Sequence, residues 1–258
     1  MIVFCAGKTY TEQPNSISES FHRPSLDSIV TFLSEKELVA AFIPHLGSFL
    51  LQPGTFQYRF EVDFGGRIAD IVLARFQNPP PSEKRLKPFR QVKQSDLFYM
   101  AQLVPRPLKA ETLASRTWSD LNKVKEITRK MERHHLITRT ESGMALAAGD
   151  WHCILPSEVV AFEAKLYDWR QAIIQAAVYA QKSDRSWVIM PDEQRENSEL
   201  RKECKERGLG LAVLDQSGRI FKLVRPRATK NARDQINNMR LRLLWDMARH
   251  QKDEWFTS

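Results

Sequence analysis

Apolar and polar residues change their spacing along the chain, and each change marks a predicted element. After a polar, aperiodic stretch over residues 1–24, an apolar stripe with helical spacing begins near Ser34. Ser34 as N-cap and Glu37 three residues later have the spacing of a capping box, which predicts the start of a helix. Residues 57–62 and 67–75 then read as two strands, separated by a turn that contains two glycines. This part of the chain predicts one helix followed by a β-hairpin.

A different pattern follows the proline-rich break at residues 78–82. Residues 95–103, 109–116 and 119–134 have helical apolar spacing, and residues 136–146 read as two short strands. Three helices followed by a two-stranded ribbon resemble a winged helix-turn-helix, whose third helix normally enters the major groove of DNA. A helical spacer or a protein-docking module has the same pattern, so the pattern alone leaves these alternatives open.

Strands and helices alternate again in the last third of the chain. The predicted elements are a strand at 159–166, a helix at 169–181, a strand at 186–190, a helix at 198–207, hairpin strands at 211–215 and 219–224, and a helix at 234–250. With the first helix and hairpin, this order predicts a mixed α/β sheet that has helices on its faces. The predicted division is an arm and the first part of the core at 1–76, an inserted module at 77–155, the second part of the core at 156–226, and a basic C-terminal helix at 227–258.

Positive charge is concentrated in two segments. The 258 residues carry a formal net charge of +8. Residues 77–155 contain 14 Lys or Arg against 8 Asp or Glu, and residues 219–252 contain 10 against 2, so the remainder is acidic. Such a distribution favours a polyanionic partner held near an acidic centre, although basic surfaces also occur without one.

Cysteine content and hydropathy bear on the cellular compartment in which the protein is expected. Three cysteines without a C-x-x-C pair argue against a disulfide scaffold and against a thiolate metal site. No apolar run approaches the roughly 18–20 residues needed to span a bilayer. Residues 1–5 lack the basic start and long apolar core of a secretory signal. We therefore expect a cytoplasmic protein that does not contact a membrane.

Two short stretches contain candidate chemistry. Asp70 interrupts an otherwise apolar strand, where a buried carboxylate is costly unless it is paired or bound to a cation. Glu163 and Lys165 are two residues apart in a predicted strand, so their side chains share one face of the sheet, while that of Ala164 points to the other. Taken singly, an E-x-K sequence is more often a solvent-facing ion pair.

These residues in this order resemble the PD-(D/E)xK nuclease superfamily, which has the restriction-endonuclease-like fold. Its pattern is an acidic residue on a helix, a hairpin whose second strand carries Asp, a strand with (D/E)-x-K, and, in some branches, a helix with Q-x-x-x-Y. The matching residues here are Glu37, Asp70, Glu163-Ala164-Lys165, and Gln175 with Tyr179. The resemblance covers residues 28–76 and 156–226, which the inserted module separates. Ala69 stands where the family often has Pro.

The resemblance implies a Mg²⁺-dependent DNA endonuclease in which Mn²⁺ can substitute. Asp70, Glu163 and the Ala164 carbonyl would ligate the ion, which prefers oxygen ligands and offsets the charge of the reacting phosphate. Lys165 would orient the attacking water, and desolvation would lower its pKa. Glu37 would join through water or hold a second ion, and Gln175 would face the phosphate or the ligands. The implied products carry 5′-phosphate and 3′-hydroxyl ends.

DNA is the predicted partner, and a protein partner is also predicted. The cations expected to contact nucleic acid are Lys123, Lys125, Arg129, Lys130 and Arg139. The inserted module or the C-terminal helix would dock a protein, the helix through an apolar stripe of Ile236, Met239, Leu243, Leu244 and Met247. The nuclease would then be a subunit of a transposition or phage-defence assembly. The alternative is a non-catalytic DNA-binding regulator or partner-docking protein on a nuclease-like scaffold, and the oligomeric state stays open.

Overall fold

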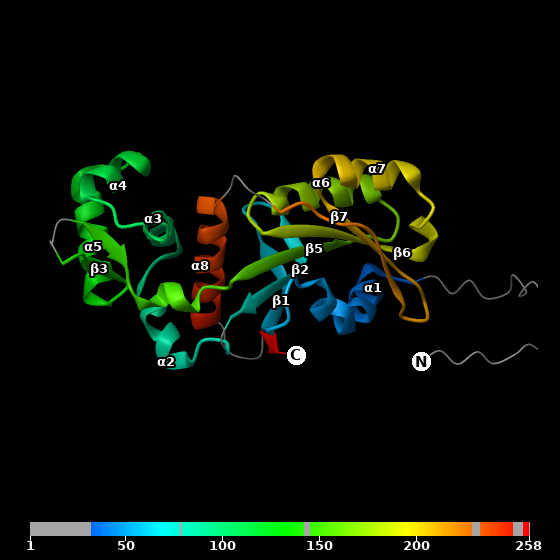
Figure 1. Ribbon diagram of the computed structural model, residues 1–258, viewed down its shortest axis with the longest axis horizontal. Helices are drawn as coiled ribbons and strands as arrows, with labels where there is room; N and C mark the ends of the chain where they lie inside the picture. Colours follow the sequence, from blue (N-terminus) through cyan, green and yellow to red (C-terminus); the bar gives the residue numbers. More distant parts are fainter. Residues whose placement is uncertain (1–31, 78, 142–144, 229–232, 250–254, 258) are drawn as a thin grey trace, which may run out of the picture. The chain divides into compact units, whose positions relative to one another are not determined.

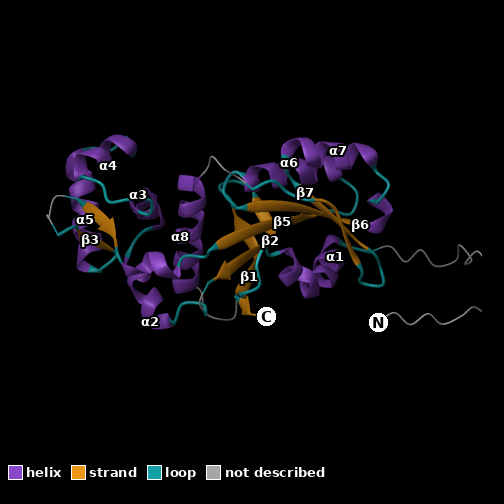
Figure 2. Cartoon of the chain, in the orientation of Figure 1, coloured by secondary structure: helices purple, strands orange, loops and turns teal. Residues whose placement is uncertain are grey.

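The structure describes most of the chain after its first 31 residues. It is a computed structural model in which residues 32–77, 79–141, 145–228, 233–249 and 255–257 are described (Figures 1 and 2). The segment Thr31–Ser258 forms one compact unit. The arm expected over residues 1–24 and the turn of the expected ribbon at 142–144 lie outside the described residues.

The predicted mixed α/β sheet is confirmed. Its strands are β1 (Thr55–Asp63), β2 (Ile68–Phe76), β5 (Glu158–Ala164), β6 (Arg185–Pro191), β7 (Gly210–Leu214), β8 (Ile220–Val224) and the two-residue β9 (Phe256–Thr257). Their order in the sheet is β8-β7-β6-β5-β2-β1-β9. The central strands β5, β6 and β7 run parallel, while β1, β2 and β8 pair antiparallel with their neighbours. The parallel strands are buried along their whole length, which explains their continuous apolar sequences.

Helices cover both faces of this sheet (Figure 1). On one face, α1 (Glu35–Phe42) and the 3₁₀ segment η1 (Ile43–Phe49) pack Phe42 and Phe49 against Phe162, with ring centroids 5.1–5.4 Å apart. On the other, α6 (Trp169–Ala180) and α7 (Ser198–Arg207) cover the parallel strands. Helix α7 ends at Gly208, whose φ of 72° favours glycine.

The segment between β2 and β5 contains the three predicted helices and the two predicted strands. They are α3 (Leu97–Leu103), α4 (Ala110–Arg116), α5 (Leu121–Arg133), β3 (Ile137–Arg139) and β4 (Leu146–Ala148). The predicted linker is itself partly helical, with α2 (Glu83–Leu86) and the short 3₁₀ segments η2 (Lys87–Gln91) and η3 (Gln94–Asp96), and η4 (Asp150–Ile154) leads into β5. An isolated bridge between Leu108 and Leu146 attaches the segment before α4 to the ribbon.

Helix α8 (Arg233–Arg249) packs against both this inserted segment and the sheet. One continuous core contains Ala69 and Val72 of β2, Met100 of α3 and Leu244 of α8. The Trp245 Nε1 also donates to the Val92 carbonyl at 3.0 Å. The insert and the C-terminal helix are therefore parts of one packed unit, because neither has a separate core.

The apolar stripe of α8 was predicted to dock a partner protein, but the chain itself covers it. Ile236, Met239, Leu243 and Leu244 are buried, and Met247 packs, partly buried, against the shared core. Charged residues of the helix also form ion pairs within the chain. Arg240 lies 2.8 Å from Asp184, Arg242 lies 3.0 Å from Asp63, and Asp246 lies 3.9 Å from Arg59. No helix among the described residues is both long and apolar enough to cross a membrane.

The shared core predicts that the insert and the sheet unfold together. Leu244 is fully buried, so Leu244→Ala leaves a cavity and should reduce the free energy of unfolding by about 2–5 kcal/mol. Thermal unfolding followed by circular dichroism should show one transition at a lower temperature. The exposed Gln235→Ala on the same helix is the control. Two separate transitions in the wild type would contradict the shared core.

Candidate active site

The register of β2 and β5 places Asp70 and Glu163 opposite each other. The ladder pairs Arg75 with Glu158 and continues to Ile71 with Phe162. One step further along the same register, Asp70 faces Glu163. Directly opposed residues of an antiparallel pair share a face and have Cβ atoms roughly 4.5–5.5 Å apart. The two carboxylates that are 93 positions apart in the sequence therefore meet at the end of the ladder.

A backbone hydrogen bond and two ion pairs hold this cluster together. The Ala164 N–H donates to Asp70 Oδ2 at 2.7 Å, which locks the side chain of β2 onto the end of β5. The Lys165 Nζ lies 3.4 Å from Glu163 Oε1 and 2.9 Å from Glu35 Oε2. The Glu163 side chain is 1% exposed, so its charge has little access to water. The predicted shared face of Glu163 and Lys165 is thus observed as a direct contact.

Helix α6 contributes the next contacts. The Tyr179 hydroxyl lies 2.9 Å from Glu163 Oε2 and 2.6 Å from the Ile68 carbonyl, and its single proton can be donated to only one of them at a time. Gln175, one helical turn earlier, interacts with the same hydroxyl. Its amide Oε1 is buried and has no hydrogen-bond partner among the described residues. Both residues predicted from the Q-x-x-x-Y spacing therefore lie beside the carboxylates.

Of the two glutamates in the first turn of α1, Glu35 and not Glu37 contacts the cluster. Half of the predicted capping box is present: Ser34 Oγ accepts from the Glu37 N–H at 3.2 Å. The Glu37 Oε2 accepts from the Leu33 N–H at 2.8 Å, one residue before the N-cap, so it still binds a backbone N–H at the helix start. Glu35 instead contacts Lys165. The structure thus brings Glu35, and not the predicted Glu37, into contact with Lys165, because the Glu37 carboxylate is engaged at the helix start.

A fourth acidic residue, Glu61, was not predicted. The β1–β2 register pairs Phe60 with Ile71 and Val62 with Ala69, so Glu61 stands opposite Asp70 on the other side of β2. Its φ is 53°, a left-handed conformation that is rare for a residue other than glycine. The negative charge of Glu61 raises the pKa of Asp70. Nothing in the strand pattern of residues 57–62 singles out this position.

Burial and like charge raise the pKa of both opposed carboxyls. Burial raises the pKa of Asp70, and the charges of Glu35 and Glu61 add to the effect. Burial, followed by the charge of Asp70, raises the pKa of Glu163 to about 7. Burial alone would lower the pKa of Lys165, but Glu35, Glu163 and Asp70 outweigh it and raise that pKa. The predicted lowering of the Lys165 pKa is therefore wrong, and this lysine is a stable cation.

The donor set suits a divalent cation that prefers oxygen. Within the described part of the chain, Lys165 is the only cation that pairs with Glu35 or Glu163. One positive charge among several carboxylates leaves an excess of negative charge, which the structure relieves by raised carboxyl pKa values and which a cation would relieve directly. The partnerless Gln175 Oε1 is a further oxygen acceptor beside them. Among the described residues, no preformed group of three metal-ligating side chains is found.

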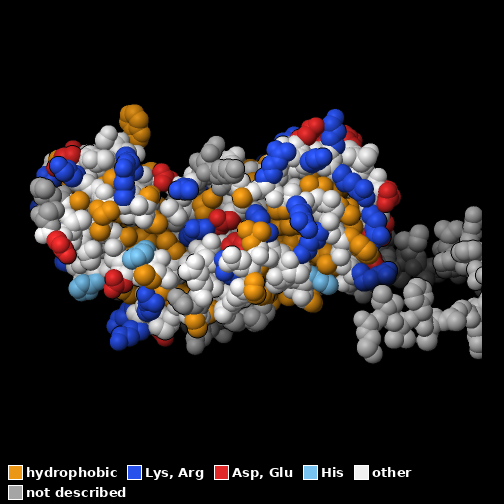
Figure 3. Space-filling view, in the orientation of Figure 1, with side chains coloured by type: hydrophobic (Ala, Val, Ile, Leu, Met, Phe, Trp, Pro, Cys, Tyr) orange, Lys and Arg blue, Asp and Glu red, His pale blue; other side chains and the backbone are white. Residues whose placement is uncertain are grey.

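Three of the five cations predicted to contact nucleic acid line one pocket, and the other two lie outside it. Lys125, Arg129 and Arg139 line one pocket together, whereas Lys123 is exposed outside it. Lys130 lies 3.9 Å from Asp96 instead. On the face seen in Figure 3, Lys and Arg side chains are spread over the insert and over the region of α6 and α7, without one continuous basic stripe.

Comparisons with protein-family models, with curated proteins and with solved structures find no significant match to this chain. Inference about its chemistry therefore depends on the geometry of the site. That geometry joins Asp70, Glu163 and Lys165 at one end of the β2–β5 ladder, with Glu35, Tyr179 and Gln175 around them.

The raised pKa of Glu163 predicts a particular pH dependence of stability. A carboxyl whose pKa rises from 4.5 when unfolded to about 7 when folded stabilises the protein below pH 4.5, and this contribution is lost as the pH rises through 7. Between pH 5 and 8, in a chelator, the wild type should lose on the order of 3 kcal/mol more than Glu163→Gln. Chemical denaturation at several pH values measures this difference.

The exposed Glu196→Gln is the matched control for that experiment, and it should follow the wild type. Mg²⁺ or Mn²⁺ should restore stability at pH 8 in the wild type but not in Glu163→Gln. Identical pH dependence in the wild type and Glu163→Gln would contradict the buried, charge-coupled carboxyl described above.

Proposed function

We propose that the protein is a metal-dependent nuclease that hydrolyses phosphodiester bonds of DNA. The observation that carries this proposal is the convergence of Asp70 and Glu163, opposed across a ladder, with Lys165 beside Glu163. Two carboxylates and one lysine in this arrangement are what the resemblance to PD-(D/E)xK nucleases implies. A restriction-endonuclease-like core and an inserted winged helix are the finer fold that we propose with it.

The residues fit the chemistry of phosphodiester hydrolysis. A divalent ion held by Asp70, Glu163 and the Ala164 carbonyl would act as a Lewis acid toward the phosphate and the attacking water. Asp70 Oδ2 is fixed by the Ala164 N–H, and its Oδ1 accepts no hydrogen bond from a described residue. The Tyr179 hydroxyl orients Glu163 so that Oε1 faces Lys165. The protein thus holds both carboxylates in place before the substrate binds, which reduces reorganisation during the reaction.

Lys165 supplies positive charge at the same point. Its ammonium stays protonated, because the surrounding carboxylates raise its pKa. A protonated lysine cannot act as a general base, so its role is to position the water and to stabilise the negative charge that develops on the phosphate. Glu35 pairs with the ammonium at 2.9 Å and limits its orientations, which makes Glu35 a positioning residue.

The insert supports DNA as the substrate. It places three helices and a two-stranded ribbon beside the core, and its segment is basic in sequence. The arginines of α8 are less available for DNA phosphates than their sequence suggests, because Arg240 and Arg242 form ion pairs within the chain. The insert is therefore the main candidate for contact with phosphates. Membership of a transposition or phage-defence assembly stays a prediction, for which the buried stripe of α8 offers no docking surface.

The nuclease proposal predicts loss of cleavage when the cluster is altered. Asp70→Asn, Glu163→Gln and Lys165→Met should each reduce the rate of plasmid and linear-DNA cleavage in Mg²⁺ or Mn²⁺ by on the order of 100-fold or more. Lys202→Met and Glu196→Gln, both on the exposed surface near α7, are matched charge controls. Equal rates in the wild type and all three cluster variants would rule out this site as the catalytic one.

The contacts also predict different roles for the two acids of α1. Glu35→Gln weakens the orientation of Lys165 and should lower the cleavage rate roughly 10-fold while leaving the unfolding temperature almost unchanged. Glu37→Ala removes the acceptor of the Leu33 N–H at the helix start and should cost up to about 1 kcal/mol of stability without a specific effect on rate. Cleavage kinetics and thermal unfolding of both variants separate the two roles. The reverse pattern would contradict the placement of Glu35.

A further inference from the structure

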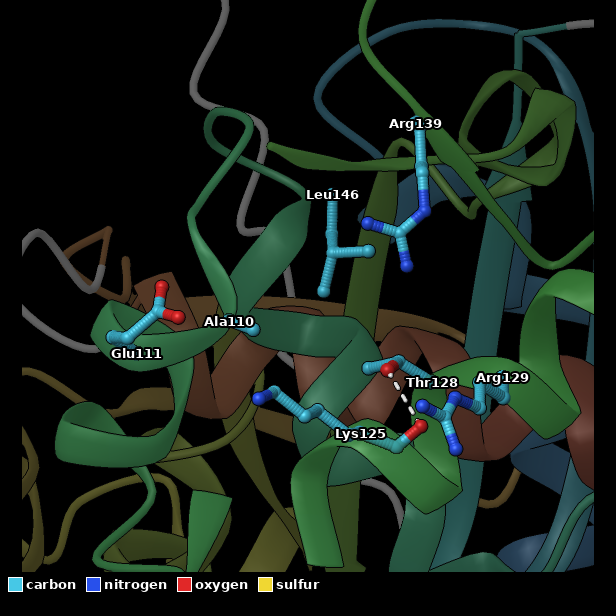
Figure 4. A pocket seen from close by; sticks show the side chains of 7 residues that line it. All are labelled: Ala110, Glu111, Lys125, Thr128, Arg129, Arg139 and Leu146. Atoms are coloured by element: carbon cyan, nitrogen blue, oxygen red, sulfur yellow. Dashed lines mark hydrogen bonds between the residues drawn. The ribbon is translucent and has the colours of Figure 1, made fainter. Parts of the chain in front are cut away.

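A pocket in the insert lies between α5, the start of α4 and the two-stranded ribbon. It is lined by Ala110, Glu111, Lys125, Thr128, Arg129, Arg139 and Leu146, and its volume is about 250 Å³. Figure 4 shows Arg139 and Leu146 reaching from the ribbon toward Lys125, Thr128 and Arg129 on the helix. The pocket is therefore bounded by three separate elements that the fold brings together.

Two of the three cations in this pocket have no ion pair among the described residues. Lys125 and Arg129 are four positions apart on α5, so they share one face of the helix. Arg139 is paired with Glu132, with its Nε 2.8 Å from the carboxylate, and this pair fixes the arginine over the pocket. Glu111 contributes one negative charge to the lining. The lining thus keeps a net positive charge that no described carboxylate neutralises at Lys125 and Arg129.

The volume of the pocket and its polar groups limit the size and the chemical class of a ligand that it can bind. A volume of about 250 Å³ is at or below the roughly 300 Å³ lower limit of pockets for drug-sized molecules, so the pocket accommodates one small group. The buried Thr128 hydroxyl donates to the Lys125 carbonyl at 3.2 Å, so the donors that remain for a ligand are those of the three cations. Guanidinium and ammonium donors around one small space match the oxygens of a phosphate.

We propose that this pocket binds one backbone phosphate of the nucleic acid, through Lys125 and Arg129 and beneath Arg139. This inference rests on the proposed function, since it assumes a DNA ligand. It also differs from the binding mode expected of a winged helix, in which the third helix enters the major groove. Two cations of α5 face the ribbon, so this side of the helix follows the sugar–phosphate chain and does not read base edges in the major groove. Contacts to phosphates position a protein but carry no sequence information directly.

The test is DNA binding by the full-length chain, measured by fluorescence anisotropy in EDTA over a range of salt concentrations. Lys125→Ala/Arg129→Ala removes the two unpaired cations of the pocket. Lys84→Ala/Arg116→Ala removes one lysine and one arginine that are exposed on α2 and α4 but do not line it. Two duplexes of equal length and unrelated sequence serve as ligands, and circular dichroism verifies that both variants fold.

The pocket variant should bind both duplexes roughly 10-fold more weakly, and the slope of log affinity against log salt should fall by about 1. The control variant should stay close to the wild type. Equal affinity of the pocket variant and the control, a loss confined to one duplex, or no binding by the wild type would each overturn the proposal. Because binding in EDTA does not require hydrolysis, absence of cleavage in Mg²⁺ would refute the proposed nuclease activity and leave this test unaffected.

Discussion

Two carboxylates face each other across the β2–β5 ladder, and much of the structure around them compensates for that arrangement. Like charges directly opposite each other on a sheet are destabilising, and burial increases the cost. Lys165 and the Tyr179 hydroxyl stabilise Glu163, while the Ala164 N–H stabilises Asp70. The compensation is incomplete, because the pKa of Glu163 still rises to about 7. A site that holds its carboxylates together at this cost is well suited to bind a divalent cation.

The packing around the sheet explains how such a cluster is kept in place. Helix α1 and η1 cover one face, and α6 carries Tyr179 and Gln175 over the other. Helix α8 packs between the insert and the sheet, and residues of all three form one core. Arg240 pairs with Asp184, whose Oδ2 also accepts from the Val159 N–H, so this helix is tied to the start of β5. Helix α8, which shares a core with the insert, is thus tied to the strand that carries Glu163.

Much of this arrangement could be predicted from sequence, where the signal was local. The two-residue spacing of Glu163 and Lys165 defines a shared face in any strand, and Asp70 stands out in an apolar run. Glu35 and Glu37 both occupy the first turn of α1, and only the structure shows which of them caps the helix. Glu61 has no sequence signal because its importance comes from the register of β1 and β2.

The partners of α8 could not be predicted for a related reason. An apolar stripe shows that a helix buries one face, but it does not show against what. The raised pKa of Lys165 likewise depends on Glu35, which is 130 positions away in the sequence. Non-local contacts of this kind determine both the domain division and the electrostatics of the site.

Binding of Mn²⁺, followed by electron paramagnetic resonance of the free ion, tests the central claim most directly. The account predicts that the wild type takes up the ion at pH 8, and that Asp70→Asn/Glu163→Gln loses this uptake while its fold is retained. Uptake by the double variant equal to that of the wild type, or none by either protein in the presence of DNA, would contradict a cation site between the two carboxylates.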